Sequence, residues 1–263
     1  MRLFVSAVGV VAPGMEGWEQ AREVLSGRAV WQSQPLGAFK PALLPANERR
    51  RTTHLIKLAL HTAEDALRDY DGRAAELASV FASSEGDAEI ADRICRALLL
   101  PDRPVSPTQF HNSVHNAAAG YWAIASGSQR FSTSIAAGPA TFAHGLLEAA
   151  SVAVLEQQDV MLLAYDFPLP PPLYGRGLAR EPFGVALILS PHAGPRCRSQ
   201  LTLSLASGAA PAHTAEMPWH ELVDANPAAA SLPLLSLLAA NEQGQLHLPC
   251  SDRQSVVVEV VPC

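Results

Sequence analysis

Two histidines four positions apart, His111 and His115 in the segment FHNSVHN, have a spacing that could serve metal chemistry. On a helix this spacing places both imidazoles on one face, where they could bind a metal ion. However, no glutamate follows His111 and no third ligand is evident. The pattern therefore favours two half-buried histidines that bond to local backbone groups at the start of a helix. We expect neither a metal nor any other cofactor.

Several familiar catalytic motifs are absent from the sequence. The chain has only two lysines, Lys40 and Lys57, and neither follows a glycine, which excludes a P-loop. No Gly-x-Gly-x-x-Gly follows a predicted strand, and no serine lies in Gly-x-Ser-x-Gly. The dinucleotide-binding fingerprint and the nucleophile elbow of hydrolases are therefore also excluded.

The composition indicates a globular protein with few surface charges. Of the 263 residues, 48% are hydrophobic and 17% are charged, and the net charge is −6. Soluble domains carry about 25% charged residues, so we expect apolar surface that is covered by another protein. The basic run Arg49–Arg51 is too short to follow a nucleic-acid backbone. We expect no nucleic-acid partner.

The four cysteines and the N-terminus bear on location. Cys95, Cys197, Cys250 and Cys263 lie far apart without Cys-x-x-Cys spacing, which favours a reducing compartment over a disulfide framework. The first residues, MRLFVSAVGVVAPG, carry one charge and end near Gly14, which favours a buried strand over a secretory signal. No apolar stretch approaches the roughly 18 residues of a membrane span. We expect a cytoplasmic protein.

Strand-like and helix-like segments alternate along the chain, which indicates an α/β layered fold. The predicted strands are Leu3–Val11, Leu77–Ala82, Phe131–Ala136, Asp159–Tyr165, Phe183–Leu189, Leu201–Ala206 and Ser255–Val261. The predicted helices are Gly17–Ser26, His54–Tyr70, Asp87–Leu99, Ser113–Ser126, Pro139–Gln157 and Ala228–Asn241. Helical spacing in 139–157 predicts a buried face made of Phe142, Leu146, Ala150, Val154 and Leu155.

The most informative segment is 132–166, where a strand enters a tight turn at Gly138, leaves as a helix and is followed by a buried strand. This order resembles the nucleophile region of the thiolase-like β-ketoacyl synthases. Three further segments are similar to parts of that family: Leu3–Gly14 to its first strand, Asn116-Ala-Ala-Ala-Gly120 to its Asn-x-x-Ala-Gly segment, and Glu181-Pro-Phe-Gly184 with Val185–Leu189 to the last strand of its N-terminal half. The resemblance is nearest to the short ketosynthase-like proteins of aryl polyene pathways.

The resemblance implies a thiolase-like α/β layered fold. We expect a nearly complete N-terminal half over residues 1–192 and an abridged C-terminal half of the same fold over 193–263. In the family, a cysteine opens the helix after the elbow, so that the helix N-terminus lowers its pKa. Alignment on Ser134-Ile135 and Asp159-Val160-Met161 puts Pro139 at that position. Proline has neither a nucleophilic side chain nor an N–H to bind an oxyanion.

The other catalytic groups of the family also lack counterparts. Its lysine and two histidines belong to the C-terminal half, but no lysine follows Lys57 here. His213, His220 and His247 occur in that half without a matching neighbourhood. We therefore assign no catalytic residue in this chain.

These departures predict a catalytically inactive, chain-length-factor-like subunit. The expected partner is a full-length β-ketoacyl synthase in aryl polyene, polyketide or fatty-acid-type biosynthesis, with an acyl carrier protein as a further partner and a homodimer when the chain is alone. The candidate interface, from segments near the family's dimer axis, is Phe110, His111, Asn112, His115, Asn116, Tyr121, Trp122, Phe131, Ser134 and Phe142. Plain core packing is the alternative for the aromatic residues Phe110, Tyr121 and Trp122.

Two other functions remain open. One is an acyltransferase that uses a replacement nucleophile, for which Ser134, Thr141 and Cys250 are nominal candidates. None of the three has a recognisable base beside it, and the nearest histidine in sequence, His144, lies three residues after Thr141 on the same helix. The other is a sensor or scaffold that binds an acyl group in the former pocket.

Overall fold

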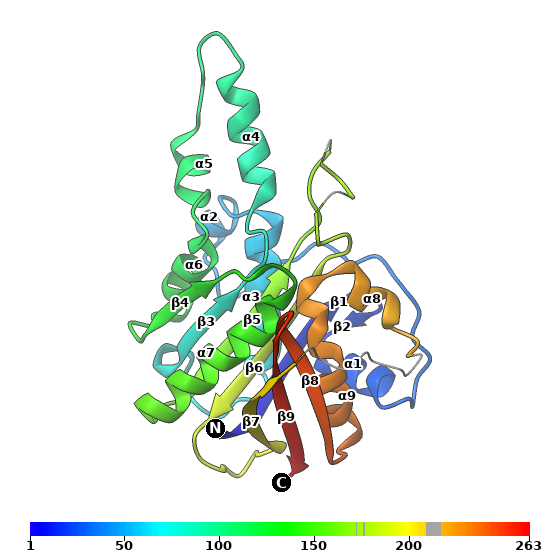
Figure 1. Cartoon of the computed structure of the whole chain (residues 1–263). Coiled ribbons are helices and arrows are strands. Elements are labelled where there is room, and N and C mark those ends of the chain that lie inside the picture. The colour runs from blue at the N-terminus through cyan, green and yellow to red at the C-terminus, as the bar shows by residue number, and fades with distance from the viewer. Residues whose placement is uncertain (172, 176, 209–216) are drawn as a thin grey trace.

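A single mixed sheet forms the centre of the molecule, with helices on both faces (Figure 1). The computed structural model describes residues 1–171, 173–175, 177–208 and 217–263. Within these residues nine strands are hydrogen-bonded in the order β4-β3-β5-β6-β1-β7-β9-β8, and β2 pairs with β1. The strands are β1 (Arg2–Ala12), β2 (Met15–Glu16), β3 (Ala78–Ala82), β4 (Ser132–Ile135), β5 (Val160–Asp166), β6 (Phe183–Ser190), β7 (Ser199–Ser207), β8 (Gly244–Ser251) and β9 (Gln254–Pro262).

Strand directions divide the sheet into two parts. Strand β3 is parallel to both β4 and β5, whereas β6 is antiparallel to β5 and to β1. If β2 is left out and the other strands are numbered along the chain, the first five strands of the sheet lie in the order 3-2-4-5-1. One of them, β6, runs in the opposite direction to the other four. On the far side of β1, the strands β7, β9 and β8 are all antiparallel to their neighbours. The C-terminal segment thus continues the same sheet, and the predicted division after residue 192 falls between β6 and β7.

The helices cover the two faces unequally. They are α1 (Trp18–Leu25), α2 (Ala46–Arg49), α3 (His54–Leu67), α4 (Ala88–Leu98), α5 (Pro107–Asn112), α6 (Ala117–Ser126), α7 (Thr141–Glu156), α8 (His220–Ala225) and α9 (Leu232–Ala240), with 3-10 turns at Ala74–Glu76, Gly138–Ala140 and Pro227–Ser231. Alternate residues of β5 show the division: Leu162 packs with the apolar residues of α7, α1 and α9, and Leu163 packs with those of α3 and α6. Helices α4 and α5 extend from this body as an arm (Figure 1).

Two glycines set the distance between α3 and the sheet. A Cβ atom at Gly9 of β1 would lie 2.4 Å from the carbonyl oxygen of Thr62, and one at Gly184 of β6 would lie 2.4 Å from the Thr62 hydroxyl. Because β1 and β6 are neighbours, the absence of a side chain at both glycines leaves one flat region of the sheet, against which α3 packs. The glycine in the first strand, whose segment Leu3–Gly14 is similar to the first strand of the family, therefore serves helix packing.

A buried carboxylate joins the ends of the central strands. Asp166, at the end of β5, accepts hydrogen bonds from the Ser83 hydroxyl at 2.8 Å and from the backbone N–H groups of Ser84 and Glu85 at 2.9 and 3.3 Å. The side chain of Asn226 donates to the Asp166 carbonyl at 3.1 Å. Burial raises the pKa of Asp166 to about 7, although the bonds from Ser84 and Ser83 oppose this shift.

The structure confirms most of the predicted elements and corrects others. Strand β8 and the short helices α2, α5 and α8 were not predicted, and α6 begins at Ala117 instead of Ser113. On α7, Phe142, Leu146 and Ala150 are buried as expected, but Leu155 is 79% exposed, so its assignment to the buried face is wrong.

The cysteines also differ from expectation. Cys197 and Cys263 form a disulfide, with their Cα atoms 5.8 Å apart, while Cys95 and Cys250 are free. The pairing of β7 with β9 brings these distant positions together, since Ser199 lies opposite Pro262. The cytoplasmic location loses the support of the cysteine pattern and stays a prediction.

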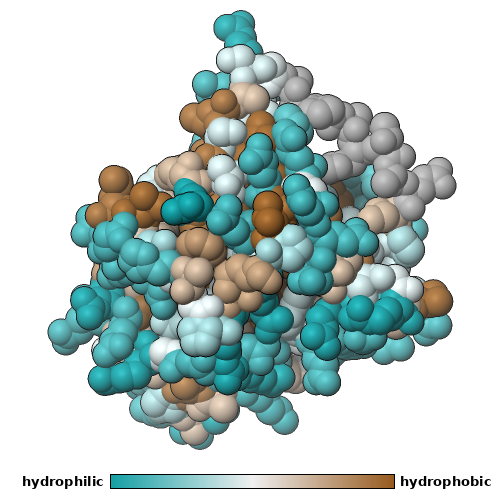
Figure 2. Space-filling model, turned by 90° about the horizontal axis from the view of Figure 1, so that it is seen from below, coloured by the Kyte–Doolittle hydropathy of each residue, from teal (hydrophilic) through white to brown (hydrophobic). Residues whose placement is uncertain are grey.

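The surface and the helices bear on two further expectations. In the described part of the chain, no helix has both the length and the apolar character needed to cross a membrane. Seen from below, the surface is mostly hydrophilic, and hydrophobic side chains form small separate groups on it (Figure 2). The low content of charged residues therefore does not produce one continuous apolar surface on this face.

The close contact at Gly9 predicts a large cost for a single methyl group. Gly9→Ala should lower the free energy of unfolding by about 2 kcal/mol or more, because the added carbon meets backbone atoms of α3 that cannot move aside. Gly194→Ala is the matched control, since nothing lies within 4 Å of its added carbon. Urea unfolding of both variants measures the difference, and equal stabilities would contradict the packing described.

The raised pKa of Asp166 predicts a pH-dependent stability difference from Asp166→Asn. The folded state keeps the carboxyl proton to a higher pH than the unfolded state, whose pKa is near 3.8. The contribution is therefore complete below about pH 4 and is lost as the pH rises through about 7, by up to about 1.4 kcal/mol per pH unit. Unfolding curves at several pH values should show the native protein losing stability relative to the variant over this range. A difference that stays constant or grows with pH would refute the assignment.

Candidate functional site

The elbow between β4 and α7 is held by one threonine. Gly138 has a φ of +54°, which glycine adopts at low cost. The Thr141 hydroxyl donates to the Gly138 carbonyl at 2.7 Å and accepts from the Ala137 N–H at 2.9 Å. These two bonds close the turn locally, without any contribution from a ligand or a catalytic group.

Pro139 occupies the position where the family resemblance places the nucleophile. It lies in the 3-10 turn Gly138–Ala140 and its side chain is exposed. A proline suits the first turn of a helix because the N–H it lacks would have no partner within the helix. The sequence therefore meets the structural demand of the turn, and neither a nucleophile nor an amide donor is present at Pro139.

The replacement nucleophiles are poorly placed for reaction. Thr141 is buried, and its hydroxyl already donates to Gly138. Burial raises the pKa of the Cys250 thiol, which disfavours the reactive thiolate. The Ser134 hydroxyl is buried without a hydrogen-bond partner in the described residues. None of the three has the activated state that nucleophilic catalysis requires.

The histidines do not supply a base for these groups. His144 Nε2 lies 3.2 Å from the Cys250 carbonyl oxygen, which can only accept, so this nitrogen carries a proton. His220 contacts Asp224 on α8, and His247 lies on β8. His213 lies outside the described residues. Among the residues that are described, no histidine hydrogen-bonds to the side chain of Ser134, Thr141 or Cys250.

The two histidines of the pair contact different elements. His115 Nε2 donates to the Ser83 carbonyl at 2.9 Å, and the His111 ring meets Tyr121 edge-on with ring centres 6.4 Å apart. Both histidines are exposed instead of half-buried, and the Ser83 partner of His115 lies just after β3, far from His115 in the chain, so the predicted local bonding is wrong. The described ranges contain no group of three or more His, Cys, Asp or Glu side chains suited to a metal ion.

A groove lies beside the strand that enters the elbow. Within the described part of the chain, β4 pairs with β3 and with no other strand. The groove, of about 530 Å³, runs between β4 and α6 and is lined mostly by small or polar side chains. Its lining residues are His115, Asn116, Ala119, Gly120, Ala123, Ser132, Thr133 and Ser134. We call these residues the β4 groove.

Exposed apolar side chains occur in the segment 110–131, which also supplies the α6 side of the β4 groove. Phe110 of α5, Val114 before α6, Ile124 of α6 and Phe131 before β4 are between 46% and 69% exposed. Phe110 and Phe131 were singled out from the sequence, but Val114 and Ile124 were not. The exposure of Ile124 could have been inferred from the sequence, because residues two positions apart on a helix lie on different faces and Trp122 belongs to the buried face.

Four of the candidate interface residues lie in the core instead. Tyr121, Trp122 and Phe142 are at most 3% exposed. For Tyr121 and Trp122, core packing was the alternative to an interface role, and their burial agrees with that alternative. Asn112 is also buried; it accepts from the Tyr121 hydroxyl at 3.1 Å and donates to the Arg51 carbonyl at 2.8 Å. Asn112, Tyr121 and Trp122 hold α5 and α6 in place, whereas Phe142 of α7 packs in the core on the other face of the sheet, so none of the four is available to a partner. Phe110, His111, His115, Asn116 and Phe131 are exposed, and Ser134 is half-buried.

Comparisons with known proteins agree with this architecture. A family model described as "Beta-ketoacyl synthase, N-terminal domain" matches residues 18–253. The match extends beyond the 1–192 segment in which the sequence resemblance was evident. Among curated proteins, none matches the sequence.

Solved structures share the fold at low sequence identity. A structure of a ketosynthase in complex with its chain length factor from Xenorhabdus doucetiae has a TM-score of 0.73 and 24% identity, covering 98% of this chain and 99% of the matched one. A type II polyketide synthase acyl-carrier protein in complex with its ketosynthase gives 0.79 and 12%, covering 100% and 99%. A β-ketoacyl synthase from Burkholderia phymatum gives 0.59 and 15%, covering 92% and 71%.

The likeness to these structures and the family match confirm the predicted mixed α/β layered fold of the ketosynthase N-terminal half. The elbow, the strand order and the family model, which covers most of the chain, all support the same family assignment. This chain belongs to the β-ketoacyl synthase N-terminal domain family.

Proposed function

We propose that the chain is a catalytically inactive, chain-length-factor-like subunit that forms a heterodimer with a full-length β-ketoacyl synthase. The observation that carries this proposal is the elbow, which keeps the fold of a nucleophile turn but has Pro139 at its apex. The bonds of Thr141 and the raised pKa of Cys250 argue against a replacement nucleophile. In such a pair, the partner supplies the catalytic residues.

The edge of the sheet supports a partner of the same fold. An edge strand presents N–H and C=O groups that another strand can pair with. Strand β4 has such an edge, with the β4 groove and the exposed Phe110, Val114, Ile124 and Phe131 nearby. Apolar side chains near a strand edge suit a stable protein interface.

The solved relatives support a ketosynthase as the proposed partner. Three structures whose chains are covered almost end to end contain a ketosynthase, two of them together with a chain length factor. The separate β-ketoacyl synthase chain is covered less completely. We therefore propose a role in aryl polyene, polyketide or fatty-acid-type biosynthesis in the cytoplasm, with an acyl carrier protein as a transient second partner. Alone, the chain is proposed to form a homodimer.

Because the elbow has Pro139 in place of a nucleophile, we predict that the chain forms no covalent bond with an acyl group. After incubation with acyl-carrier substrates and the ketosynthase encoded nearest to its gene, intact-protein mass spectrometry should show the acyl adduct on the ketosynthase alone. The ketosynthase adduct is the positive control in the same sample. A stoichiometric adduct on this chain would contradict the proposal, because it would require a nucleophile that the structure does not provide.

The β4 edge predicts that one charge on this strand blocks assembly. Ser134→Asp should prevent the heterodimer, because a carboxylate would be desolvated in an interface expected to bury more than roughly 2,000 Å². Ser204→Asp controls for the added charge alone, since Ser204 is an exposed serine on β7, outside the groove, whereas Ser134 is half-buried.

Co-expression with that ketosynthase, followed by size-exclusion chromatography with light scattering, measures both variants. The native chain and Ser204→Asp should elute with the ketosynthase as a heterodimer, and Ser134→Asp should elute separately with its circular dichroism unchanged. Two stable species for the native pair would overturn the proposal.

A further inference from the structure

Two cavities meet at the beginning of α3. One, of about 440 Å³, lies between the segment 35–39, the loop after β1 and the ends of β5 and β6. The other, of about 370 Å³, lies between the start of α3 and the arm formed by α4 and α5. His54 and Lys57, on the first turn of α3, line both cavities. The two spaces are therefore neighbours that share these two side chains as lining.

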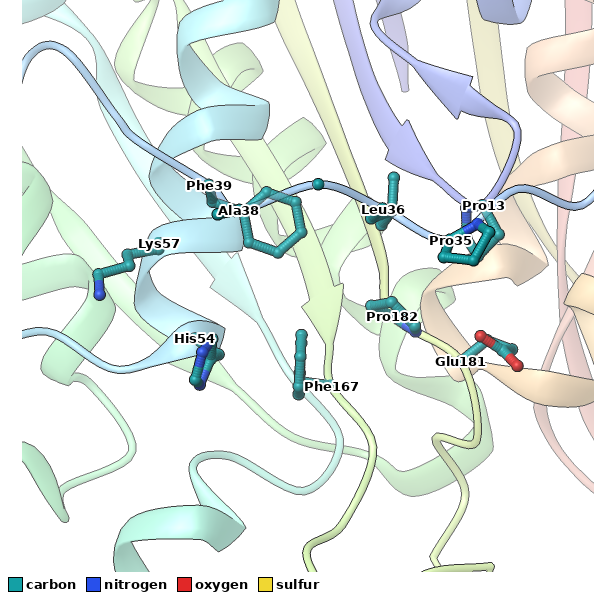
Figure 3. Close-up of a pocket in the computed structure, with 11 residues that line it drawn as sticks. Pro13, Pro35, Leu36, Ala38, Phe39, His54, Lys57, Phe167, Glu181 and Pro182 are labelled. Carbon is teal, nitrogen blue, oxygen red and sulfur yellow. The ribbon is translucent and has the colours of Figure 1, made fainter.

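The first cavity has an apolar lining. Figure 3 shows Phe39 and Phe167 within it, His54 and Lys57 at one end, and Glu181 at the other. The His54 ring stacks on Phe167, with ring centres 5.7 Å apart and planes 19° apart. Its remaining apolar lining consists of Pro13, Pro35, Leu36, Ala38 and Pro182. A cavity of this size and lining suits the apolar part of a small molecule.

The second cavity has an excess of positive charge. Arg50, Arg51, Lys57 and Arg93 line it, and Glu89 is its only carboxylate. Glu89 pairs with Arg93 and also lies 3.2 Å from His54.

The cations of this cavity are not all neutralised. Arg51 contacts Glu48 at 3.4 Å, whereas Arg50 and Lys57 have no carboxylate within ion-pair distance in the described residues. Two cations without a partner, beside two that are each paired with a glutamate, make this cavity attractive to an anion.

We propose that the joined cavities bind one amphipathic anion, with a carboxylate or phosphate head between Arg50 and Lys57 and an apolar body against Phe39 and Phe167. The two halves of such a molecule match the two linings, and Lys57 lies where the head must meet the body. The position of Glu181 at the far end of the apolar cavity fixes the direction, because an anionic head there would meet a like charge.

This binding site does not overlap the β4 groove. The two cavities share no lining residue with the β4 groove. The site needs neither a nucleophile nor a ketosynthase partner, so its test does not depend on the proposed function.

Isothermal titration calorimetry of the purified full chain tests the proposal with three ligands. Decanoate below its micelle concentration carries both head and body, inorganic phosphate carries the head alone, and decyltrimethylammonium carries the body with the opposite charge. Decanoate should bind at one site, at least tenfold more tightly than either of the others. Its affinity should fall as salt is raised, because the cations are partly exposed.

Variants locate the site. Lys57→Gln combined with Arg50→Gln should weaken decanoate binding at least tenfold, and Phe39→Ala should weaken it several-fold. Arg2→Gln removes an exposed cation outside both cavities and should leave binding unchanged. Circular dichroism checks that each variant is folded.

Several outcomes would overturn the proposal. They are no decanoate binding, equal binding of inorganic phosphate, or an unchanged affinity in the Lys57 and Arg50 variant. Binding of an acidic carrier protein that depends on these residues, without binding of decanoate, would also overturn it by showing a protein-docking surface instead.

Discussion

The edge of strand β4 is the structural constraint on which the proposed assembly depends. In the described residues, β4 is the terminal strand of the sheet and has only β3 beside it. A short polar edge strand is stable in contact with water, and β4 is of this kind because Ser132, Thr133 and Ser134 have polar side chains. The nearby apolar side chains change this balance. Full burial of an apolar side chain is worth about 1.5–3 kcal/mol, against about 0.5–1.5 kcal/mol for a typical hydrogen bond. Phe110, Val114, Ile124 and Phe131 would therefore supply most of the association energy, while the strand edge would set the register.

The same strand leads into the elbow, where architecture and chemistry are separated. The turn depends on the positive φ of Gly138 and on the two hydrogen bonds of Thr141. Neither feature needs a reactive side chain at Pro139. A subunit can therefore lose its nucleophile and keep the strand, the turn and the long helix α7 that packs on the sheet. Asp166 and the close contact of α3 at Gly9 stabilise the central strands in a way that is also independent of catalysis.

Much of this architecture could be predicted from the sequence because the signals are local. Buried strands such as β5 and β6 are continuous apolar runs, and α3 has clear helical periodicity. Strand β8 was missed because Gly244 and Pro249 interrupt its pattern. Leu155 was misplaced because it lies in the last turn of α7, where spacing alone does not show that the sheet no longer covers the helix.

The candidate site was harder to predict because it depends on contacts between distant segments. The segment 110–134 holds both exposed and buried aromatic residues. That Trp122 is buried and Phe131 is exposed follows only from the packing of α6 on the sheet. The disulfide of Cys197 and Cys263 depends on the pairing of β7 with β9. The cavities at α3 combine residues from seven parts of the chain, and no sequence motif marks them.

Hydrogen–deuterium exchange of the β4 backbone tests the central claim most directly. The amides of residues 132–135 that face away from β3 should exchange rapidly in a dilute sample of the isolated chain. They should become strongly protected when the full-length ketosynthase is added, while the amides of edge strand β8 keep their rate. Protection of β4 in the complex would support a partner that pairs along this edge. An unchanged exchange rate at 132–135 in a stable complex would contradict it.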